Sequence, residues 1–282
     1  MHTVITSEEL RERVDEWRRA GEHVALVPTM GNLHRGHLGL IDLAREHAEK
    51  IVVSIFVNPT QFVHGEDFDT YPRTLDRDTR LLKRAEVDLL FTPEIETMYP
   101  FGADNATSVT VPILSDEFCG LHRPGHFNGV TTLVSRLFGL VQPDTAVFGQ
   151  KDFQQQLIIR RMTTDLGLPI KIVTGETVRE KDGLALSSRN QYLSDDERKK
   201  APVLFQTLQK IGSELQSGEQ NFEELENNAD ATLREAGFEL DYVAIRRAED
   251  LSEPDRDCDE LVVFAAATLG KARLIDNIIV SV

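Results

Sequence analysis

The sequence predicts an α/β fold in which a parallel-sheet domain is followed by a smaller α+β C-terminal domain. In the first part of the chain, apolar runs rich in β-branched residues, such as 51–57, alternate with amphipathic helical segments. Strands that are covered by helices on both faces have this composition. After Ser194 the order changes to two helices followed by three apolar strands, which indicates a separate α+β unit. We therefore expect one domain over residues 1–176 and a second over 177–282.

The elements of the first domain follow from apolar periodicity and from the glycines and prolines. A helix is expected from Ser7, and the first buried strand, 24–27, is expected to stop at Pro28, which cannot donate to a sheet ladder. Further strands are predicted at 51–57, 87–91, 108–111, 145–148 and 170–174. Helices are predicted after His34 and at 74–85, 130–141 and 153–166. This alternation implies right-handed crossovers and a parallel sheet, with ligands bound beyond the carboxyl ends of the strands.

The second domain begins with a capping box from Ser194 to Glu197, which opens a long helix expected to reach Gln216. A second helix is predicted at 222–236, where Gly237 ends it. Three apolar strands complete the chain and are expected to form an antiparallel sheet; they span 240–245, 261–268 and 273–280.

Composition and charge exclude several classes of partner. Acidic residues outnumber basic ones 47 to 31, so a formal net charge of −16 opposes binding to nucleic acid or to an anionic membrane. The two cysteines, Cys119 and Cys258, are too few for a disulfide scaffold. The N-terminal residues have neither the apolar core of a signal peptide nor the character of a transit peptide, and no run approaches the roughly 20 apolar residues of a membrane span. We expect a cytoplasmic protein without a membrane partner.

The strongest chemical signal is a pair of histidines at a predicted strand-to-helix turn. His34 and His37 lie three residues apart, with Gly31 and Gly36 beside them. The first turn of a helix attracts anions through its unpaired N–H groups and its dipole, and imidazoles there can donate to phosphate oxygens or carry a proton. The alternative is that each histidine is a surface residue and each glycine only makes a turn. Two histidines in this context favour a phosphate site.

Other polar residues follow later strands. Gln61 comes after the strand 51–57 and suits a ligand with hydroxyl and carboxylate groups, although the segment also reads as a simple turn around a solvated side chain. Lys151 stands at a predicted helix start, where it either reaches a phosphate or is merely solvated, and Gln155 lies four residues further along. Two hydroxyls beside a guanidinium, in Ser187, Ser188 and Arg189, suit the binding of an anion. The alternative is that this segment is a flexible linker between the domains. The roles of Arg123 and His126 stay open.

Together, these motifs identify a known family. The chain resembles the pantothenate synthetase family, within the nucleotidylyl transferase superfamily, over nearly its whole length. The resemblance rests on VPTMGNLHRGH, FVNPTQF, YPRT, RPGHF, FGQKDFQQ and DGLALSSRN, in this order. The chain departs from the family pattern at few positions: Gly39 replaces a common Ser, Gln150 stands where Glu is also usual, and Arg35 fills the variable place between the histidines.

The resemblance implies a Rossmann-like, nucleotidylyl transferase-type domain and an ATP-dependent ligase. Its substrates are pantoate and β-alanine, and its products are pantothenate, AMP and pyrophosphate, formed through pantoyl adenylate. Mg²⁺ is expected to enter on the ATP phosphates without a named protein ligand. A homodimer, and a C-terminal domain that covers the active site, are also implied. The rivals are another adenylyl or cytidylyl transferase of the superfamily, and an idle nucleotide-binding module.

The resemblance also assigns roles to individual residues. His34 and His37 would hold the α- and β-phosphates, with His37 as proton donor, and Gln61 and Gln155 would bind pantoate. The residues expected to grip the departing phosphates are Lys151, Ser187, Ser188 and Arg189. The residues expected to contact ATP are Met30, Gly31, Asn32, Leu33, His34, Arg35, Gly36, His37, Gly149, Gln150, Lys151, Asp152, Val178, Leu186, Ser187, Ser188 and Arg189.

Overall fold

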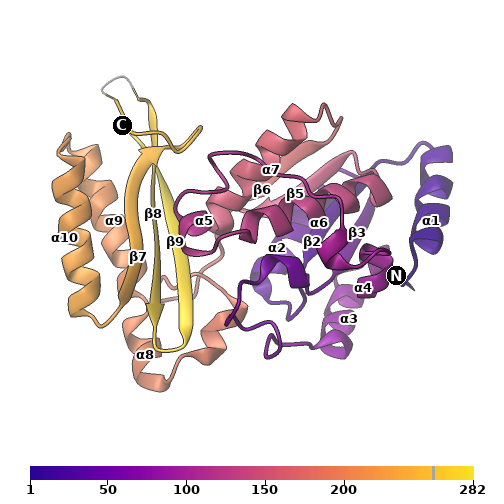
Figure 1. Ribbon diagram of the computed structural model, residues 1–282, viewed down its shortest axis with the longest axis horizontal. Helices are drawn as coiled ribbons and strands as arrows, with labels where there is room; N and C mark the ends of the chain where they lie inside the picture. Colours follow the sequence, from indigo (N-terminus) through magenta and orange to yellow (C-terminus); the bar gives the residue numbers. More distant parts are fainter. Residues whose placement is uncertain (256–257) are drawn as a thin grey trace. The chain divides into compact units, whose positions relative to one another are not determined.

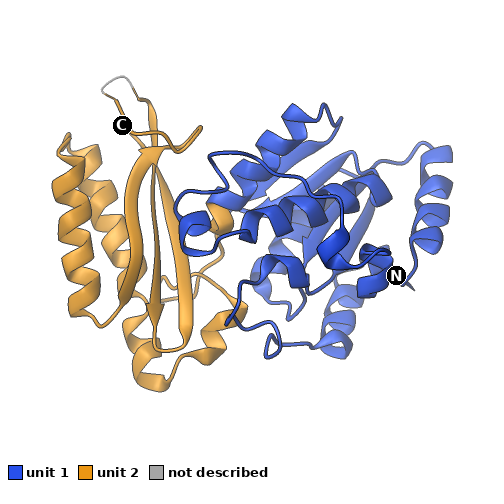
Figure 2. Ribbon diagram, in the orientation of Figure 1, with its two compact units in different colours: residues 1–149, 154–176 blue, residues 150–153, 177–282 orange. Residues whose placement is uncertain are grey.

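The structure is a computed structural model that describes residues 1–255 and 258–282. The described chain divides into two compact units, shown in two colours in Figure 2. The first comprises residues 1–149 and 154–176, and the second comprises residues 150–153 and 177–282. The short segment 150–153 therefore belongs with the C-terminal part of the chain, although it directly follows β5 in sequence and includes the first residue of α7.

The first unit contains a six-stranded parallel sheet, so the predicted α/β class is confirmed. The strand order is β1-β4-β3-β2-β5-β6, and Figure 1 labels β2, β3, β5 and β6 among these strands. The strands are β1 (His2–Val4), β2 (Val24–Thr29), β3 (Lys50–Ile55), β4 (Leu89–Phe91), β5 (Thr145–Gly149) and β6 (Lys171–Gly175). The chain moves from β2 to β3 and β4 on one side and later returns to β5 on the other. The order therefore reverses between β2 and β5, and such a switch point is where α/β sheets bind ligands.

Helices connect the strands of the first unit. They are α1 (Ser7–Arg19), α2 (Arg35–Arg45), α3 (Leu75–Arg84), α4 (Ile95–Met98), α5 (Cys119–His122), α6 (His126–Val141) and α7 (Phe153–Asp165), with 3₁₀ turns η1 (Pro59–Gln61) and η2 (Ala103–Asn105). The 3₁₀ turn η3 (Gln150–Asp152), which precedes α7, belongs to the second unit. Helix α2 packs against β2, β3 and β5. Its buried face, with Ile41 and Ala44, joins Val27 and Val53 of the sheet in one apolar core. The first turn of α2 is thereby fixed against the centre of the sheet.

Three features of this unit differ from the sequence predictions. The predicted strand at 108–111 is absent from the described residues, because side chains of α6 satisfy its backbone: Val109 N–H donates to Thr132 Oγ1 at 3.0 Å, and its carbonyl accepts from Thr131 Oγ1 at 2.5 Å. Strand β1 was not predicted and pairs in parallel with β4. Strand β2 continues through Pro28, which is tolerated because the ladder to β5 reaches only Leu26.

The second unit contains an antiparallel sheet in the order β7-β8-β9, as predicted. Its elements are η4 (Ser188–Tyr192), α8 (Asp195–Lys200), α9 (Val203–Gln216), α10 (Phe222–Glu235), β7 (Glu239–Arg247), β8 (Glu260–Leu269) and β9 (Ala272–Ser281). Figure 1 shows α9 and α10 on one face of this sheet, where their apolar residues form a core with the strands.

The single long helix predicted from Ser194 to Gln216 is wrong. The capping box is present, with Ser194 Oγ accepting from the Glu197 N–H, but α8 ends at Lys200 and α9 begins at Val203. Pro202 lies between them, and proline lacks the N–H that a continuous helix needs at this point. The polar segment 187–192 that precedes α8 includes η4.

Candidate active site

The histidine pair forms the turn between β2 and α2, as predicted. His34 is the N-cap of α2, and its Nδ1 accepts from the Gly36 N–H at 3.2 Å. His37 reaches back, so that its Nδ1 accepts from the His34 N–H at 3.2 Å. The two side chains thus make a reciprocal capping box, in which histidines replace the usual Ser or Thr and Glu. Their ring centroids lie 4.0 Å apart.

This arrangement determines which ring nitrogen carries the proton. A neutral imidazole has one donor and one acceptor nitrogen. Because Nδ1 of His34 and of His37 each accepts from a backbone N–H, the proton of each neutral ring resides on Nε2. One nitrogen of each ring therefore builds the turn, and the other is a hydrogen-bond donor. Two such donors on adjacent rings at a helix N-terminus suit the oxygens of a phosphate.

The loop before the histidines is held by a residue that sequence analysis missed. Asp78 of α3 is fully buried, and its two carboxylate oxygens accept from the Asn32 N–H at 2.8 Å and the Leu33 N–H at 3.0 Å. Thr74 Oγ1 donates to the same carboxylate at 3.0 Å. Gly31 has a φ of +82°, and a Cβ there would meet Asp78 Oδ2 at 3.2 Å. The sequence predicts a helix at 74–85 but gives no sign that Asp78 within it is buried.

Gln61 lies in a buried hydrogen-bond network after β3. The Asn58 side chain, fully buried, donates to Gln61 Oε1 at 3.2 Å and to the Gly129 carbonyl at 3.1 Å. Tyr99 donates its hydroxyl proton to Asn58 Oδ1 at 2.7 Å, and burial raises the pKa of this hydroxyl. Gln61 Nε2 contacts the sulfur of Met30 at 3.1 Å. A predicted pantoate residue and a predicted ATP residue therefore touch each other.

Arg123 and His126, whose roles the sequence left open, hold the main chain of Gln61. His126 Nδ1 lies 2.6 Å from the Gln61 carbonyl, and Arg123 Nη2 donates to the same oxygen at 3.3 Å. Arg123 also pairs with Glu66, with Nη2 2.8 Å from Oε2. Gly129 allows α6 to approach, since a Cβ there would lie 2.3 Å from the Thr60 carbonyl oxygen. The RPGHF segment, residues 123–127, thus supports the turn that carries Gln61.

Three consecutive glutamines begin α7, and the structure separates them. Gln154 is buried and bonds to the backbone of the 114–119 segment, through Leu114 O at 2.8 Å and Cys119 N at 3.1 Å. Gln156 is buried and accepts from Thr174 Oγ1 at 3.2 Å. Gln155 is half-buried, and its side chain makes no hydrogen bond to the described residues. Of the three amides, that of Gln155 is therefore the one available to a ligand.

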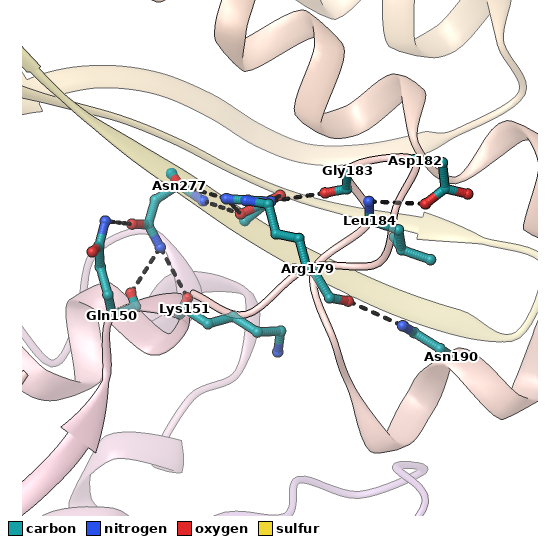
Figure 3. Close-up of polar contacts among 10 residues, drawn as sticks. Gln150, Lys151, Arg179, Asp182, Gly183, Leu184, Asn190 and Asn277 are labelled. Atoms are coloured by element: carbon teal, nitrogen blue, oxygen red, sulfur yellow. Dashed lines mark hydrogen bonds and ion pairs between the residues drawn. The ribbon is translucent and has the colours of Figure 1, made fainter. Parts of the chain in front are cut away.

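Lys151 lies in η3, a 3₁₀ turn that precedes α7, so it does not belong to the α-helix that carries Gln155. The turn follows Gly149, the last residue of β5. The carbonyls of Gln150 and Lys151 accept from Asn277 Nδ2 at 2.9 and 3.0 Å. Figure 3 shows the Lys151 side chain extending away from Asn277. Asp152 ends the turn and is half-buried.

The serine and arginine segment follows a small hairpin of the second unit. Leu186 N–H donates to the Val178 carbonyl at 2.9 Å, which brings together two residues predicted to line the adenosine pocket. Ser187 is the N-cap of η4 and accepts from the Arg189 N–H at 3.2 Å. Ser188 and Arg189 form the first turn of η4. The segment is therefore an ordered turn.

Comparison with known proteins shows which family the chain is similar to. A family model described as Pantoate-beta-alanine ligase matches residues 2–279. The chain belongs to this family. Pantothenate synthetases of Thioalkalivibrio sulfidiphilus and Alcanivorax borkumensis are 52% and 51% identical to it, over 99% and 100% of this chain and 97% and 99% of theirs. The predicted family and enzyme class, an AMP-forming ligase, are therefore confirmed.

Solved structures of the ligase family also match the fold. The pantothenate synthetase of Thermus thermophilus superimposes with a TM-score of 0.92 at 48% identity, covering 99% of each chain. The pantoate-beta-alanine ligase of Francisella tularensis, solved in complex with beta-gamma ATP and beta-alanine, matches with a TM-score of 0.80 at 32% identity, covering 99% of this chain and 97% of that one.

No helix in residues 1–255 and 258–282 is long and apolar enough to cross a membrane. Within the same ranges, no group of three or more His, Cys, Asp and Glu side chains is arranged to hold a metal ion.

Proposed function

We propose that the chain joins pantoate to β-alanine through a pantoyl adenylate formed by the residues named above. A carboxylate oxygen of pantoate attacks the α-phosphorus of ATP, and the bond to pyrophosphate breaks. The β-alanine nitrogen then attacks the acyl carbon, loses a proton, and AMP leaves. The observation that carries the proposal is the histidine capping box at the switch point of the sheet, in a chain of the ligase family.

His34 and His37 bind the α- and β-phosphates in this proposal. Negative charge grows on the phosphoryl oxygens as the bond to pyrophosphate breaks, so donors already in place lower the barrier. The capping geometry supports this role because it directs both Nδ1 atoms to the backbone and leaves Nε2 as the donor atom. His37 is proposed as the proton donor. The loop and first turn formed by Gly31, Asn32, Leu33, Arg35 and Gly36 are proposed to contact ATP at the positive end of the α2 dipole.

The departing phosphates are proposed to bind the second set of residues: Lys151, Ser187, Ser188 and Arg189. Arg offers a planar fork of donors, Lys a compact charge and Ser a rotatable hydroxyl. The ordered turns η3 and η4 support this role, since each fixes the backbone from which these side chains extend. The backbone of Met30, Gly149, Gln150, Asp152, Val178 and Leu186 is proposed to contact the nucleotide.

Pantoate is proposed to bind Gln61 and Gln155. The network around Asn58 holds the Gln61 amide in one orientation, and the Gln155 amide has no hydrogen-bond partner among the described residues. Neutral amides suit the hydroxyls of pantoate, whereas cations suit phosphates. Mg²⁺ is proposed to enter on the ATP phosphates with most of its waters, and no step is assigned to it. We also propose a cytoplasmic homodimer, on the family resemblance.

The adenylate mechanism is tested by isotope exchange. With ATP, Mg²⁺ and pantoate present and β-alanine absent, labelled pyrophosphate should enter ATP, because the first half-reaction is reversible. Omission of pantoate is the control and should abolish the exchange. Failure to detect exchange from an enzyme that still forms pantothenate would rule out the adenylate route.

A further inference from the structure

Two consecutive polar residues of β9, Asp276 and Asn277, are buried and have no part in the proposed chemistry. Their exposed fractions are 3% and 1%. Buried polar side chains are costly unless they form hydrogen bonds, so the partners of these two show what they stabilise. Strand β9 is itself well fixed, because all ten of its residues are in register with β8.

Asn277 holds the Lys151 turn. Its Nδ2 donates to the carbonyls of Gln150 and Lys151, at 2.9 and 3.0 Å, and its Oδ1 accepts from Gln150 Nε2 at 3.3 Å. These bonds join residues 126 and 127 positions apart in sequence. Both donors of one amide are thus used on consecutive carbonyls of the turn, which restricts rotation of the backbone that carries the Lys151 side chain (Figure 3).

Asp276 holds the hairpin that leads to the serine and arginine segment. Arg179 forms a bidentate ion pair with Asp276, with Nη1 2.6 Å from Oδ2 and Nη2 2.8 Å from Oδ1. Burial raises the pKa of the Asp276 carboxyl, and the Arg179 guanidinium opposes that shift. Arg179 also donates to the Gly183 carbonyl at 3.1 Å and lies over the Phe205 ring at 3.6 Å. The hairpin is thereby attached to β9 at Asp276, the residue before Asn277, which holds the Lys151 turn.

We propose that Asn277 is a positioning residue for Lys151, and that Asp276 and Asn277 together hold the Lys151 turn and the 187–189 segment as one body. The inference rests on the proposed role of Lys151 in binding phosphates. A rigid strand that carries both attachments keeps the lysine and the serine and arginine segment at a constant separation. Pre-set geometry of this kind accelerates a reaction, since a displacement of about 1 Å can cost about 10²-fold in rate.

The test uses Asn277→Asp, which keeps the side chain's shape, removes both donors and places an acceptor against two carbonyls. We expect kcat for pyrophosphate exchange to fall about 10²-fold, with the KM for pantoate unchanged. Arg273→Ala is the matched control. Arg273 lies on the same strand and pairs with Asp241 at 2.8 Å, and its side chain is 23% exposed. This variant should retain the wild-type kcat. Wild-type kcat in a folded Asn277→Asp enzyme would overturn the proposal.

A double variant shows whether Asn277 acts through Lys151. If it does, the Asn277→Asp substitution should lower kcat far less in the Lys151→Ala enzyme than in the wild-type enzyme. An equal loss in both backgrounds would overturn the positioning role. A wild-type rate for Lys151→Ala alone would instead overturn the proposed role of Lys151. If Asn277→Asp melts well below Arg273→Ala, the comparison is repeated with Asn277→Ser, which keeps one donor.

Discussion

The histidine turn of the first unit and the lysine turn of the second are held in place by different means. His34 and His37 cap their own helix, and the loop before them is held by Asp78, 46 positions from Asn32. The Lys151 turn is held by Asn277, 126 residues away. The histidine turn therefore depends on local sequence and on one neighbouring helix, whereas the lysine turn depends on the completed C-terminal sheet.

This difference has a functional consequence. A turn built by its own side chains can form once β2, α2 and α3 are in place. A turn bound to β9 follows the second unit, to which residues 150–153 belong. We infer that substitutions far from Lys151 in sequence can change its position.

The largest expected loss of kcat comes from removing a histidine or the lysine that is proposed to donate to the phosphates. His37→Ala and Lys151→Ala should each lower kcat about 10²- to 10³-fold, the loss seen when one preorganised oxyanion donor is removed. Combined, they should cost less than the product of the single losses, because groups that act on the same charge are not additive. Steady-state kinetics measures this, with thermal melts as the folding control. A well-folded single variant with near wild-type turnover would remove that residue from the catalytic set.

A smaller effect is expected from the residue that braces the histidine loop. Asp78→Ala leaves the N–H groups of Asn32 and Leu33 without their acceptor, and each unsatisfied group costs about 1 to 3 kcal/mol. We expect the free energy of unfolding to fall by at least about 2 kcal/mol, together with a loss of kcat. Asp78→Asn keeps one acceptor oxygen, so its free energy of unfolding should lie between those of the wild type and of Asp78→Ala. Denaturant unfolding gives the values, and equal stability of all three proteins would show that Asp78 does not support this loop.

The smallest effects separate the neighbouring glutamines. Gln155→Ala should raise the KM for pantoate more than that for ATP, at a cost of about 1 to 3 kcal/mol, and leave the melting temperature unchanged. Gln61→Ala should also raise the KM for pantoate more than that for ATP. Gln154→Ala is the matched control: it should lower the melting temperature, because its side chain bonds to the 114–119 backbone. Pantoate kinetics unchanged in both Gln61→Ala and Gln155→Ala would mean that pantoate binds elsewhere.

Much of this architecture was predictable because its signals are local. Periodicity and β-branched runs located β2, β3, β5 and the three C-terminal strands, and the short spacing of His34 and His37 marked the turn before α2. Errors arose where tertiary contacts outweigh local pattern. Residues 108–111 have strand composition, but Thr131 and Thr132 of α6 take the hydrogen bonds of a ladder.

The supporting residues of the site were harder to predict. Asp78 lies in a helix dense with charge, and its sequence neighbours do not show that its carboxylate is buried against the Asn32 loop. Asp276 and Asn277 are two polar residues in an apolar strand, and that interruption was the available signal. Which loops they hold depends on contacts across about a hundred residues, which no local pattern records.

The central claim is that each histidine builds the turn with Nδ1 and acts on ATP with Nε2. His34→Asn tests it most directly, since Asn is among the best N-cap residues and its Oδ1 replaces Nδ1, while nothing replaces Nε2. We predict that His34→Asn keeps the melting temperature of the wild type, whereas His34→Ala loses about 1 kcal/mol of stability with the cap. Both should lose pantoate-dependent pyrophosphate exchange about 10²-fold or more. Exchange at the wild-type rate in His34→Asn would contradict the account, because it would show that His34 only caps the helix.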